Sequence, residues 1–349
     1  MNRIVYFPNN KLGFSLIELM TATAISLILL VLVLQTVDSI SKIGRRVKAN
    51  VETFQSARTG FEALTRHLSN TTLNTYYDYF DANGIVRTPG NAFFSPAYYG
   101  RNSSLHFVCG STPSLTGLTA IRHPGHSIFF QAPRNYSANS QIDRTQGIMN
   151  ACGYLVQHGQ PPVRPGFLSS LTANGPYRYR LMEFLQPSEE LSVYTQSGTG
   201  WFTNQLTGNL NTLAENVILL AILPKLPADQ DPTGTLISPN YAYNSRANAS
   251  SFTGTPPRQP INAHQLPPII HITMVAIDEL SAGRLEAKFG TAAPTLGLET
   301  LFNNASQYDA DIQTLEAILN GITSTNDIPL SYRIFEAEIR IPGAKWSGN

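Results

Sequence analysis

The stretch of residues 14–37 constrains this chain most, because Glu18 is its only charged residue. A helix over this range is about 36 Å long at about 1.5 Å per residue, and the hydrocarbon core of a bilayer is about 30 Å thick. The run Leu27–Leu34 is apolar on every side of such a helix. A cleaved secretory signal is the alternative, but its small-residue cleavage site follows the apolar run, whereas Ala22 and Ala24 precede it here. We therefore expect this stretch to span a membrane.

A carboxylate inside such a stretch needs a partner, because an ionised acid near the centre of a bilayer costs about 2.5–3.5 kcal/mol. Glu18 lies in the sequence GFSLIELM, residues 13–20. This segment resembles the prepilin cleavage and methylation motif of type IV pilins and type II secretion pseudopilins. The resemblance implies that prepilin peptidase cuts between Gly13 and Phe14 and methylates the new amino group of Phe14. It also implies that Glu18 pairs with that amine on a neighbouring subunit, which relieves the desolvation of both charges.

The same resemblance implies a structural subunit rather than an enzyme. The expected protein is a minor pilin or pseudopilin of a type IV pilus-like or type II secretion pseudopilus filament, and its bulky globular part favours a place at the tip. The implied partners are prepilin peptidase, other pilin or pseudopilin subunits and inner-membrane lipid. The alternative is a membrane-anchored extracellular binding module that carries a pilin-type signal. The two hypotheses differ in whether Glu18 matters for function.

The topology that follows has a cytoplasmic leader, residues 1–13, one span in the inner membrane and a periplasmic C-terminal domain. The basic residues favour the opposite orientation by the positive-inside rule. Two of them precede the span and four follow it closely: Arg3 and Lys11, then Lys42, Arg45, Arg46 and Lys48. We give the motif precedence, because the peptidase must reach the leader from the cytoplasmic side.

No proline follows the leader before Pro89, so nothing interrupts a helix that continues from the span to about Leu73. Residues 38–75 are expected to be its amphipathic continuation, with Gly44 and Gly60 as soft points. An autonomous coiled coil is the alternative, but the stripe is short and contains large aromatic residues. The apolar residues recur at intervals of three and four: Ile40, Ile43, Val47, Val51, Phe54, Ala57, Phe61, Leu64 and Leu68.

Residues 76–349 have short apolar runs separated by Gly, Pro, Asn and Ser, which predicts an antiparallel β domain. The fold class is therefore α+β, a long N-terminal membrane-spanning helix packed on an antiparallel β-sheet domain. Short helices are expected at Ser188 and over Gln307–Leu319. Residues 228–267 lack periodicity and are expected to form a long mobile surface loop. The predicted strands are Ser104–Cys109, Ser127–Gln131, Met149–Gln157, Tyr177–Phe184, Asn216–Leu223, Ile269–Ile277, Arg284–Phe289 and Ser331–Ile341.

Two further segments carry narrower resemblances. The amphipathic segment 54–68 resembles the helix of PilW-like minor pilins and J-type pseudopilins, in which an arginine and spaced leucines precede the β domain. The segment LNTYYDYFD, residues 73–81, resembles the family called Verru_Chthon cassette protein C. The residues Tyr76, Tyr77, Tyr79 and Phe80 in this segment are expected to join the helix to the sheet, and an exposed binding surface is the alternative.

Composition and motifs exclude several other classes. The net charge is +1, from 24 basic and 23 acidic residues, so no nucleic-acid partner is expected. The chain lacks G-x-S-x-G, a P-loop and H-E-x-x-H, and we expect no enzyme activity, no cofactor and no metal. His123 and His126 are three residues apart without further ligands nearby and are expected on the surface. The segment Asp229–Gly234 resembles the start of a calcium loop but lacks the glutamate of an EF-hand.

Two cysteines are too few for a disulfide framework. If the strands that carry Cys109 and Cys152 pair with one another, these residues can form a disulfide that stabilises the domain by about 3–5 kcal/mol. Two buried free thiols are the alternative. The sequence alone leaves both open.

Overall fold

The computed structural model describes residues 16–88, 90–139, 141–142, 145–161, 175–323 and 326–346. Within the first helix the backbone is described throughout, but the side chains of Glu18 and of residues 38–53 are not. The chain divides into two compact units, residues 1–49 and residues 50–349. The second unit is a globular domain, and the first helix runs through the boundary between the two.

The first helix, α1 (Leu16–Ser69), is continuous and ends before the predicted end near Leu73. The amide of Thr72 donates to the carbonyl oxygen of Gln131 at 2.9 Å, so the chain already follows a sheet at that point. The acceptor lies in strand β4 (His126–Pro133). The backbone that would otherwise have extended the helix is therefore hydrogen-bonded to the sheet.

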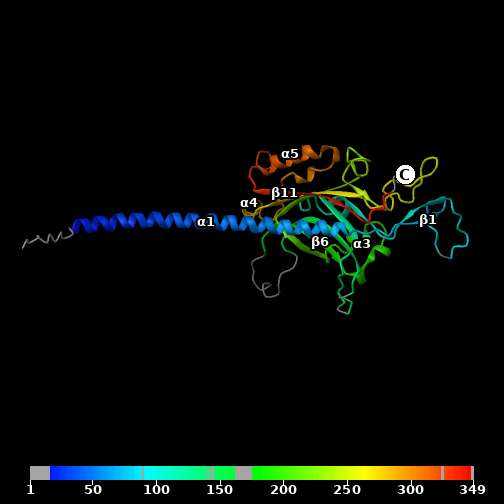
Figure 1. The fold of residues 1–349 in the computed structure, drawn as a ribbon, viewed down its shortest axis with the longest axis horizontal. Coiled ribbons are helices and arrows are strands. Elements are labelled where there is room, and N and C mark those ends of the chain that lie inside the picture. Colours follow the sequence, from blue (N-terminus) through cyan, green and yellow to red (C-terminus); the bar gives the residue numbers. More distant parts are fainter. Residues whose placement is uncertain are drawn as a thin grey trace, which may run out of the picture. The chain divides into compact units, whose positions relative to one another are not determined.

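The described strands form three antiparallel sheets, and together with the helices they confirm the α+β class (Figure 1). The two-stranded ribbon pairs β1 (Tyr76–Phe80) with β2 (Tyr98–Asn102). The three-stranded sheet has the order β11-β10-β8 and contains β8 (Val217–Lys225), β10 (Ile269–Ile277) and β11 (Tyr332–Arg340). The six-stranded sheet has the order β7-β6-β5-β4-β3-β9 and contains β3 (Val108–Ser111), β4, β5 (Met149–Gly159), β6 (Arg178–Gln186), β7 (Leu210–Glu215) and β9 (Tyr243–Asn244).

Each predicted strand overlaps an observed strand, with the exception of Arg284–Phe289. That prediction is wrong, because these residues belong to helix α4 (Glu279–Phe289). The Asp278 carboxylate caps this helix by accepting a hydrogen bond from the amide of Ser281 at 2.7 Å, which satisfies one of the N–H donors that a helix start leaves unpaired. Asp278 lies immediately before the helix. The helix start that it stabilises prevails over the alternation of apolar residues, which had predicted a strand.

The remaining helices are short. The predicted helix near residue 307 is confirmed as α5 (Tyr308–Leu319), whereas the one at Ser188 is a single 3-10 turn. Helices α4 and α5 lie over one face of the three-stranded sheet (Figure 1). Two further short helices are α2 (Thr112–Thr116) and α3 (Gly200–Thr203).

The six-stranded sheet is buried on both faces, which explains why its strands read as continuous apolar runs. On β4, Ile128 and Phe130 belong to the core between the two large sheets, while Phe129 points to the opposite face. There its ring stacks on Phe202 of α3 at a centroid distance of 3.8 Å. Two hydrophobic cores thus hold this sheet, one on each side.

The C-terminal part of α1 packs on the domain through the predicted apolar stripe. Ala57, Leu64 and Leu68 are completely buried, which confirms the stripe over this part. The ring of Phe61 lies 5.8 Å from that of Phe335 on β11. Gly60 lies against Ala214 of β7. The helix therefore contacts the edge strand β11 of the three-stranded sheet and the edge strand β7 of the six-stranded sheet.

Gly60 is a point of close approach and not the predicted soft point. A Cβ atom at this position would lie 2.9 Å from the Cβ of Ala214, closer than packed carbon atoms approach. We expect Gly60→Ala to lower the free energy of unfolding by about 1 kcal/mol net, because overpacking of about 1–3 kcal/mol exceeds a gain in helix propensity of about 1 kcal/mol. Ser56→Ala on the exposed side of the same helix is the control, and thermal unfolding of the purified protein is the measurement. A more stable Gly60→Ala variant contradicts the close contact.

Residues 228–267 contain little regular structure, as predicted, but several of them are buried, so their placement on the surface is wrong. The mobility of this segment stays a prediction. The segment contributes β9 to the six-stranded sheet, and Tyr241 and Tyr243 are almost completely buried. The amide of Ser245 donates to the carbonyl oxygen of Phe107 at 2.9 Å. These aromatic residues were the available signal, because a chain that buries two tyrosines is anchored to the core at those points.

Candidate functional site

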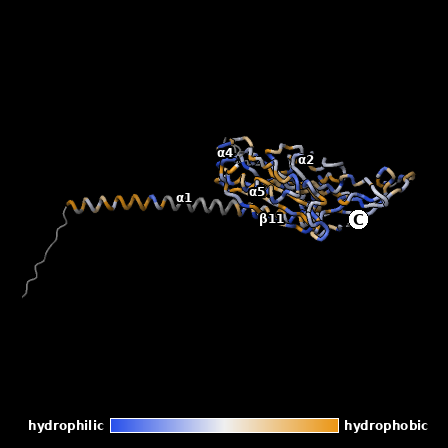
Figure 2. Tube along the Cα trace, turned by 90° about the horizontal axis from the view of Figure 1, so that it is seen from above, coloured by the Kyte–Doolittle hydropathy of each residue, from blue (hydrophilic) through white to orange (hydrophobic). Residues whose placement is uncertain are grey.

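The first part of α1 is exposed and apolar over Leu19–Val37, long enough to cross a bilayer, and none of this stretch is buried against the rest of the described chain. Figure 2 shows the hydrophobic run along this part of the helix and the mixed colouring of the domain. Exposed leucine, isoleucine and valine on all sides are unfavourable in water and favourable in lipid. This segment is therefore suited to anchor the chain in a membrane.

The threonines of this segment are compatible with lipid, because their hydroxyl groups are satisfied inside the helix. Thr21 donates to the carbonyl oxygen of Ile17 at 3.0 Å, and Thr36 donates to that of Val33 at 2.8 Å. Thr23 makes the same kind of bond at 2.9 Å. In hydrocarbon an unpaired hydroxyl is costly, so these internal bonds lower the cost of burying the helix in a membrane.

The residues of the predicted processing site lie at the beginning of this helix. Gly13 and Phe14 are outside the described residues, so the cut between them stays a prediction. Glu18 lies in the first turn of α1, immediately before the stretch that can span a membrane. Its side chain is not described, and its pairing with a neighbouring amine also stays a prediction.

Of the two alternatives left open for the cysteines, the structure has the free thiols. Cys109 and Cys152 are buried free thiols. Cys109 lies on β3 opposite Ile128, and Cys152 lies on β5 opposite Phe130, so the whole of β4 separates them. Strands are about 4.8 Å apart, which puts the two chains about 9.6 Å apart, beyond the reach of a disulfide. Burial raises the pKa of Cys152 to about 12, so this thiol is unreactive at neutral pH.

The two histidines predicted on the surface are both buried. Nδ1 of His126 accepts the amide of Ile222 at 2.9 Å, and Nε2 donates to the carbonyl oxygen of Phe302 at 3.0 Å. His126 therefore joins the six-stranded sheet to β8 and to a loop. Nδ1 of His123 donates to the carbonyl oxygen of Thr119, 3.1 Å away in the same turn.

The tyrosine-rich segment does not join the helix to the sheet as predicted. It forms β1 and lies at the end of the domain beyond the C-terminal end of α1 (Figure 1). Only Phe80 is buried, whereas 54% of Tyr77 and 62% of Tyr99 remain exposed. The ring of Tyr99 on β2 lies 5.6 Å from that of Tyr77 and 5.0 Å from that of Tyr79. We call Tyr77, Tyr79 and Tyr99 the tyrosine ribbon.

The carboxylate of Asp231 accepts hydrogen bonds from backbone amides of the loop that follows it. One carboxylate oxygen accepts the amides of Thr233 and Gly234 at 3.1 and 3.0 Å, and the other accepts the amide of Leu236 at 2.7 Å. Both oxygens are thus engaged with the protein. In the part of the chain that the structure describes, no three His, Cys, Asp or Glu side chains gather in the manner of a metal site.

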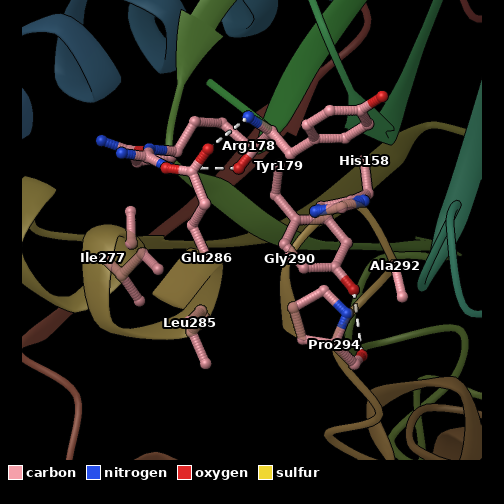
Figure 3. Close-up of a pocket in the computed structure, with 12 residues that line it drawn as sticks. His158, Arg178, Tyr179, Ile277, Leu285, Glu286, Gly290, Ala292 and Pro294 are labelled. Carbon is pink, nitrogen blue, oxygen red and sulfur yellow. Dashed lines mark hydrogen bonds and ion pairs between the residues drawn. The ribbon is translucent and has the colours of Figure 1, made fainter. Parts of the chain in front are cut away.

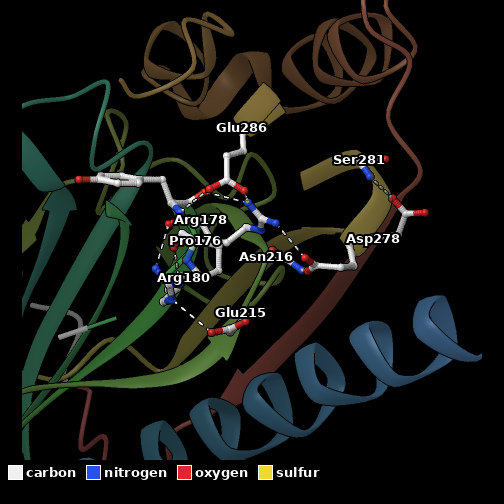
Figure 4. Close-up of polar contacts among 10 residues, drawn as sticks. Pro176, Arg178, Arg180, Glu215, Asn216, Asp278, Ser281 and Glu286 are labelled. Carbon is white, nitrogen blue, oxygen red and sulfur yellow. Dashed lines mark hydrogen bonds and ion pairs between the residues drawn. The ribbon is translucent and has the colours of Figure 1, made fainter. Parts of the chain in front are cut away.

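Two buried arginines of β6 make ion pairs with residues of α4 and of the neighbouring edge strand β7 (Figure 4). Arg178 pairs with Glu279 at 2.9 Å and also with Glu286. Arg180 pairs with Glu215 at 3.3 Å. Because a buried cation is costly without a partner, these contacts fix the position of the helix on the sheet.

A small cavity lies beside these residues, between β5, β6 and α4 (Figure 3). His158, Tyr179 and Glu286 are among the residues that line it. Its volume of about 10 Å³ is close to the space that one water molecule needs. It can therefore hold a single water molecule but no organic substrate.

A buried polar cluster joins α1 to the six-stranded sheet. The hydroxyl of Tyr154 donates to Oε1 of Glu183 at 2.7 Å, and Arg134 donates to the same oxygen at 2.8 Å. Nδ1 of His67, on α1, lies 2.6 Å from the tyrosine oxygen. Burial opposes the ionisation of Glu183, but bonds from His67, Tyr154 and Arg134 together lower its pKa to about 2. Sequence reasoning missed this cluster because its members come from four separate segments.

The geometry defines a class: a globular α+β domain on a helix whose exposed beginning is suited to a membrane. Residues 8–34 match the prokaryotic N-terminal methylation motif. This motif is the signal of type IV pilin-like and pseudopilin proteins, which are substrates of prepilin peptidase and structural subunits rather than known enzymes. The matched residues include the first part of the exposed apolar stretch of α1. No curated protein and no solved structure matches the chain.

Proposed function

We propose that the chain is a minor pilin or pseudopilin that prepilin peptidase cuts after Gly13 and methylates on Phe14. The methylation motif at residues 8–34 carries this proposal, because it contains both residues. The exposed helix that follows supplies the membrane anchor that the processing pathway requires. The leader lies in the cytoplasm in this proposal, and the domain lies in the periplasm.

Assembly into a filament rests on Glu18 and on the new N-terminus. After the cut, the methylated amine of Phe14 and the carboxylate of Glu18 both lie in an environment of low dielectric constant. Each charge is costly there alone, and a pair between neighbouring subunits offsets much of that cost. A filament of the type IV pilus or type II secretion kind is the assembly that this pairing supports.

A place at the tip follows from the size of the domain. Residues 50–349 form one compact unit. Repeating shaft subunits pack closely around their helices, and a large domain leaves little room for neighbours. A position at the end of the filament avoids this conflict.

Processing is tested on the N-terminus of protein taken from membranes. The expected mature chain begins at Phe14 and carries one methyl group on its amine, whereas Gly13→Ala retains Met1. Gly44→Ala is the matched control, because this glycine lies in the same helix and outside the motif. Intact-mass and N-terminal analysis decides between these forms. A wild-type chain that still begins at Met1 contradicts the proposal.

The tyrosine ribbon favours a second candidate, a membrane-anchored module that binds an extracellular ligand. The exposed rings of Tyr77 and Tyr79 lie 5.6 and 5.0 Å from that of Tyr99, and together the three tyrosines offer apolar ring surface and hydroxyl groups to a ligand. Such a module would function as a single anchored chain. It would therefore retain its activity when Glu18 is replaced, which separates it from the filament subunit.

A further inference from the structure

We propose that the pocket beside Arg246 binds a small hydroxylated carboxylate, such as an acidic sugar. The pocket lies between the loop after β9, the turn at residues 193–197 and Ser104. Its volume of about 360 Å³ falls in the range of about 300–1,000 Å³ that is typical of small-molecule sites. The proposal concerns the domain alone and holds whether or not the chain enters a filament.

Arg246 is held in place by the main chain. Its Nη2 donates to the carbonyl oxygens of Ser104 and Val193, the latter at 3.2 Å. Its own amide donates to the side chain of Asn244 at 2.8 Å. Within the described ranges, Nε and Nη1 of this guanidinium have no hydrogen-bond partner. Nη2 is thus fixed by the main chain, while Nε and Nη1 can still donate hydrogen bonds to another group.

The charge of Arg246 is not compensated. Arg134, Arg178 and Arg180 are each paired with a glutamate. Across the residues that the structure describes, Arg246 makes no such ion pair, and burial lowers its pKa without an opposing carboxylate. A half-buried cation of this kind is stabilised by an anion that enters from solvent.

The neighbouring histidines experience the same uncompensated charge. Burial, followed by the charges of Arg246 and Arg101, lowers the pKa of His264 to about 4. Burial also lowers the pKa of His106 to about 4; the bond to Asn244 opposes this shift, and Arg246 adds to it. Both rings are therefore neutral at pH 7. The local field remains positive because of the arginines, which favours an anion in the pocket.

The other lining groups indicate what the anion carries. Thr195, Gln196 and Ser197 are exposed on the rim and offer hydroxyl and amide groups. The ring of Tyr194 is 59% exposed at the same rim. Hydroxyl and amide groups suit a ligand with several hydroxyls, and an exposed ring suits the flat face of a sugar. Each free N–H group of Arg246 can donate a single charge-assisted hydrogen bond to a carboxylate oxygen.

The test is calorimetric titration of the full-length protein in detergent micelles at pH 7 with galacturonate. We expect saturable binding to the wild type, at least tenfold weaker binding to Arg246→Gln, and no saturation with neutral galactose. Arg258→Gln is the matched control, because this arginine is exposed in the same segment and does not line the pocket. It should bind galacturonate as the wild type does.

A second pair of variants keeps the test valid if Arg246→Gln does not fold. Ser197→Asp places a carboxylate on the rim, where it competes for the arginine, while Ser251→Asp adds the same charge at an exposed residue that does not line the pocket. We expect galacturonate binding to be lost in the first and kept in the second. Undiminished binding by Ser197→Asp, equal binding of galactose, or saturation by inorganic phosphate but not by galacturonate overturns the proposal.

Discussion

Replacing Glu18 with alanine is expected to abolish filament assembly, with at least a tenfold loss of protein in the sheared or pelleted filament fraction. The carboxylate is the partner that the proposal assigns to the methylated amine of a neighbouring Phe14. Without it, that amine stays desolvated and unpaired when subunits pack in the membrane. The variant should nevertheless insert at least as well as the wild type, because a carboxylate in or near the hydrocarbon is unfavourable and alanine is not.

Glu18→Ala should therefore lower assembly without lowering membrane insertion, and this difference makes the experiment specific. Glu18→Gln retains the shape of the side chain and should fail to assemble as alanine does. Thr23→Val is the control, because the hydroxyl of Thr23 bonds only inside its own helix turn. Cleavage after Gly13 should continue in all three variants. Assembly of Glu18→Ala at the wild-type level refutes the assembly role and favours the anchored binding module.

The domain is expected to lose several kcal/mol of stability when the pH falls from 7.5 to 5. Four of the five buried histidines have pKa values lowered to about 4, chiefly by burial: His106, His126, His158 and His264. In the unfolded chain each has a pKa of about 6.5. Between these values the unfolded chain binds more protons than the folded chain, so acid favours unfolding.

The hydrogen bonds of two of these rings explain why protonation is unfavourable. Nδ1 of His126 accepts the amide of Ile222, and Nδ1 of His106 accepts the indole N–H of Trp201 at 3.0 Å. A proton on either Nδ1 would lie against the hydrogen of an N–H donor, and the two positive hydrogens would repel each other. The neutral ring with its proton on Nε2 is therefore part of the folded structure.

The size of the effect follows from the pKa values. Each histidine costs roughly 2 kcal/mol at pH 5, because a shift of one pKa unit is worth about 1.36 kcal/mol. The loss begins as the pH falls below about 6.5 and is complete for these groups near pH 4. Stability at pH 7 and above is unaffected by them. Chemical unfolding of the full-length protein in micelles at constant ionic strength measures the difference.

His126→Gln provides the matched comparison for this prediction. A glutamine amide can accept from Ile222 and donate to Phe302, but it does not titrate. The variant should therefore lose less stability than the wild type on acidification, by roughly 2 kcal/mol at pH 5. Equal stability of the wild type at pH 7.5 and pH 5 would show that the rings accept protons without strain.

Local patterns predicted much of the fold. The apolar stretch at residues 14–37, with Glu18 as its only charge, was sufficient to predict a helix long enough to span a membrane. The spacing of Ala57, Leu64 and Leu68 correctly predicted the face that packs on the domain. The overlap of most predicted strands with observed ones has the same origin, since the period of apolar residues along a segment depends on its neighbours in sequence.

Predictions that depended on distant partners were less successful. Strand β4 separates Cys109 from Cys152, and nothing near either residue indicates this. The segment 228–267 has the composition of a loop, but it makes contacts with β3 and with residues near Phe107. The tyrosine-rich segment is exposed because its partner strand β2 pairs with it away from the helix.

The sequence by itself determined that this chain has a pilin-type signal, an apolar helix and an antiparallel β domain, because each is written in residues that are close along the chain. Only the tertiary structure decided that the cysteines are separated, that four histidines are buried in neutral form and that Arg246 lines a pocket without a carboxylate. The physical reason is that burial and charge compensation depend on which distant segments meet. Secondary structure follows from local spacing, whereas the environment of a side chain follows from the packing of the whole domain.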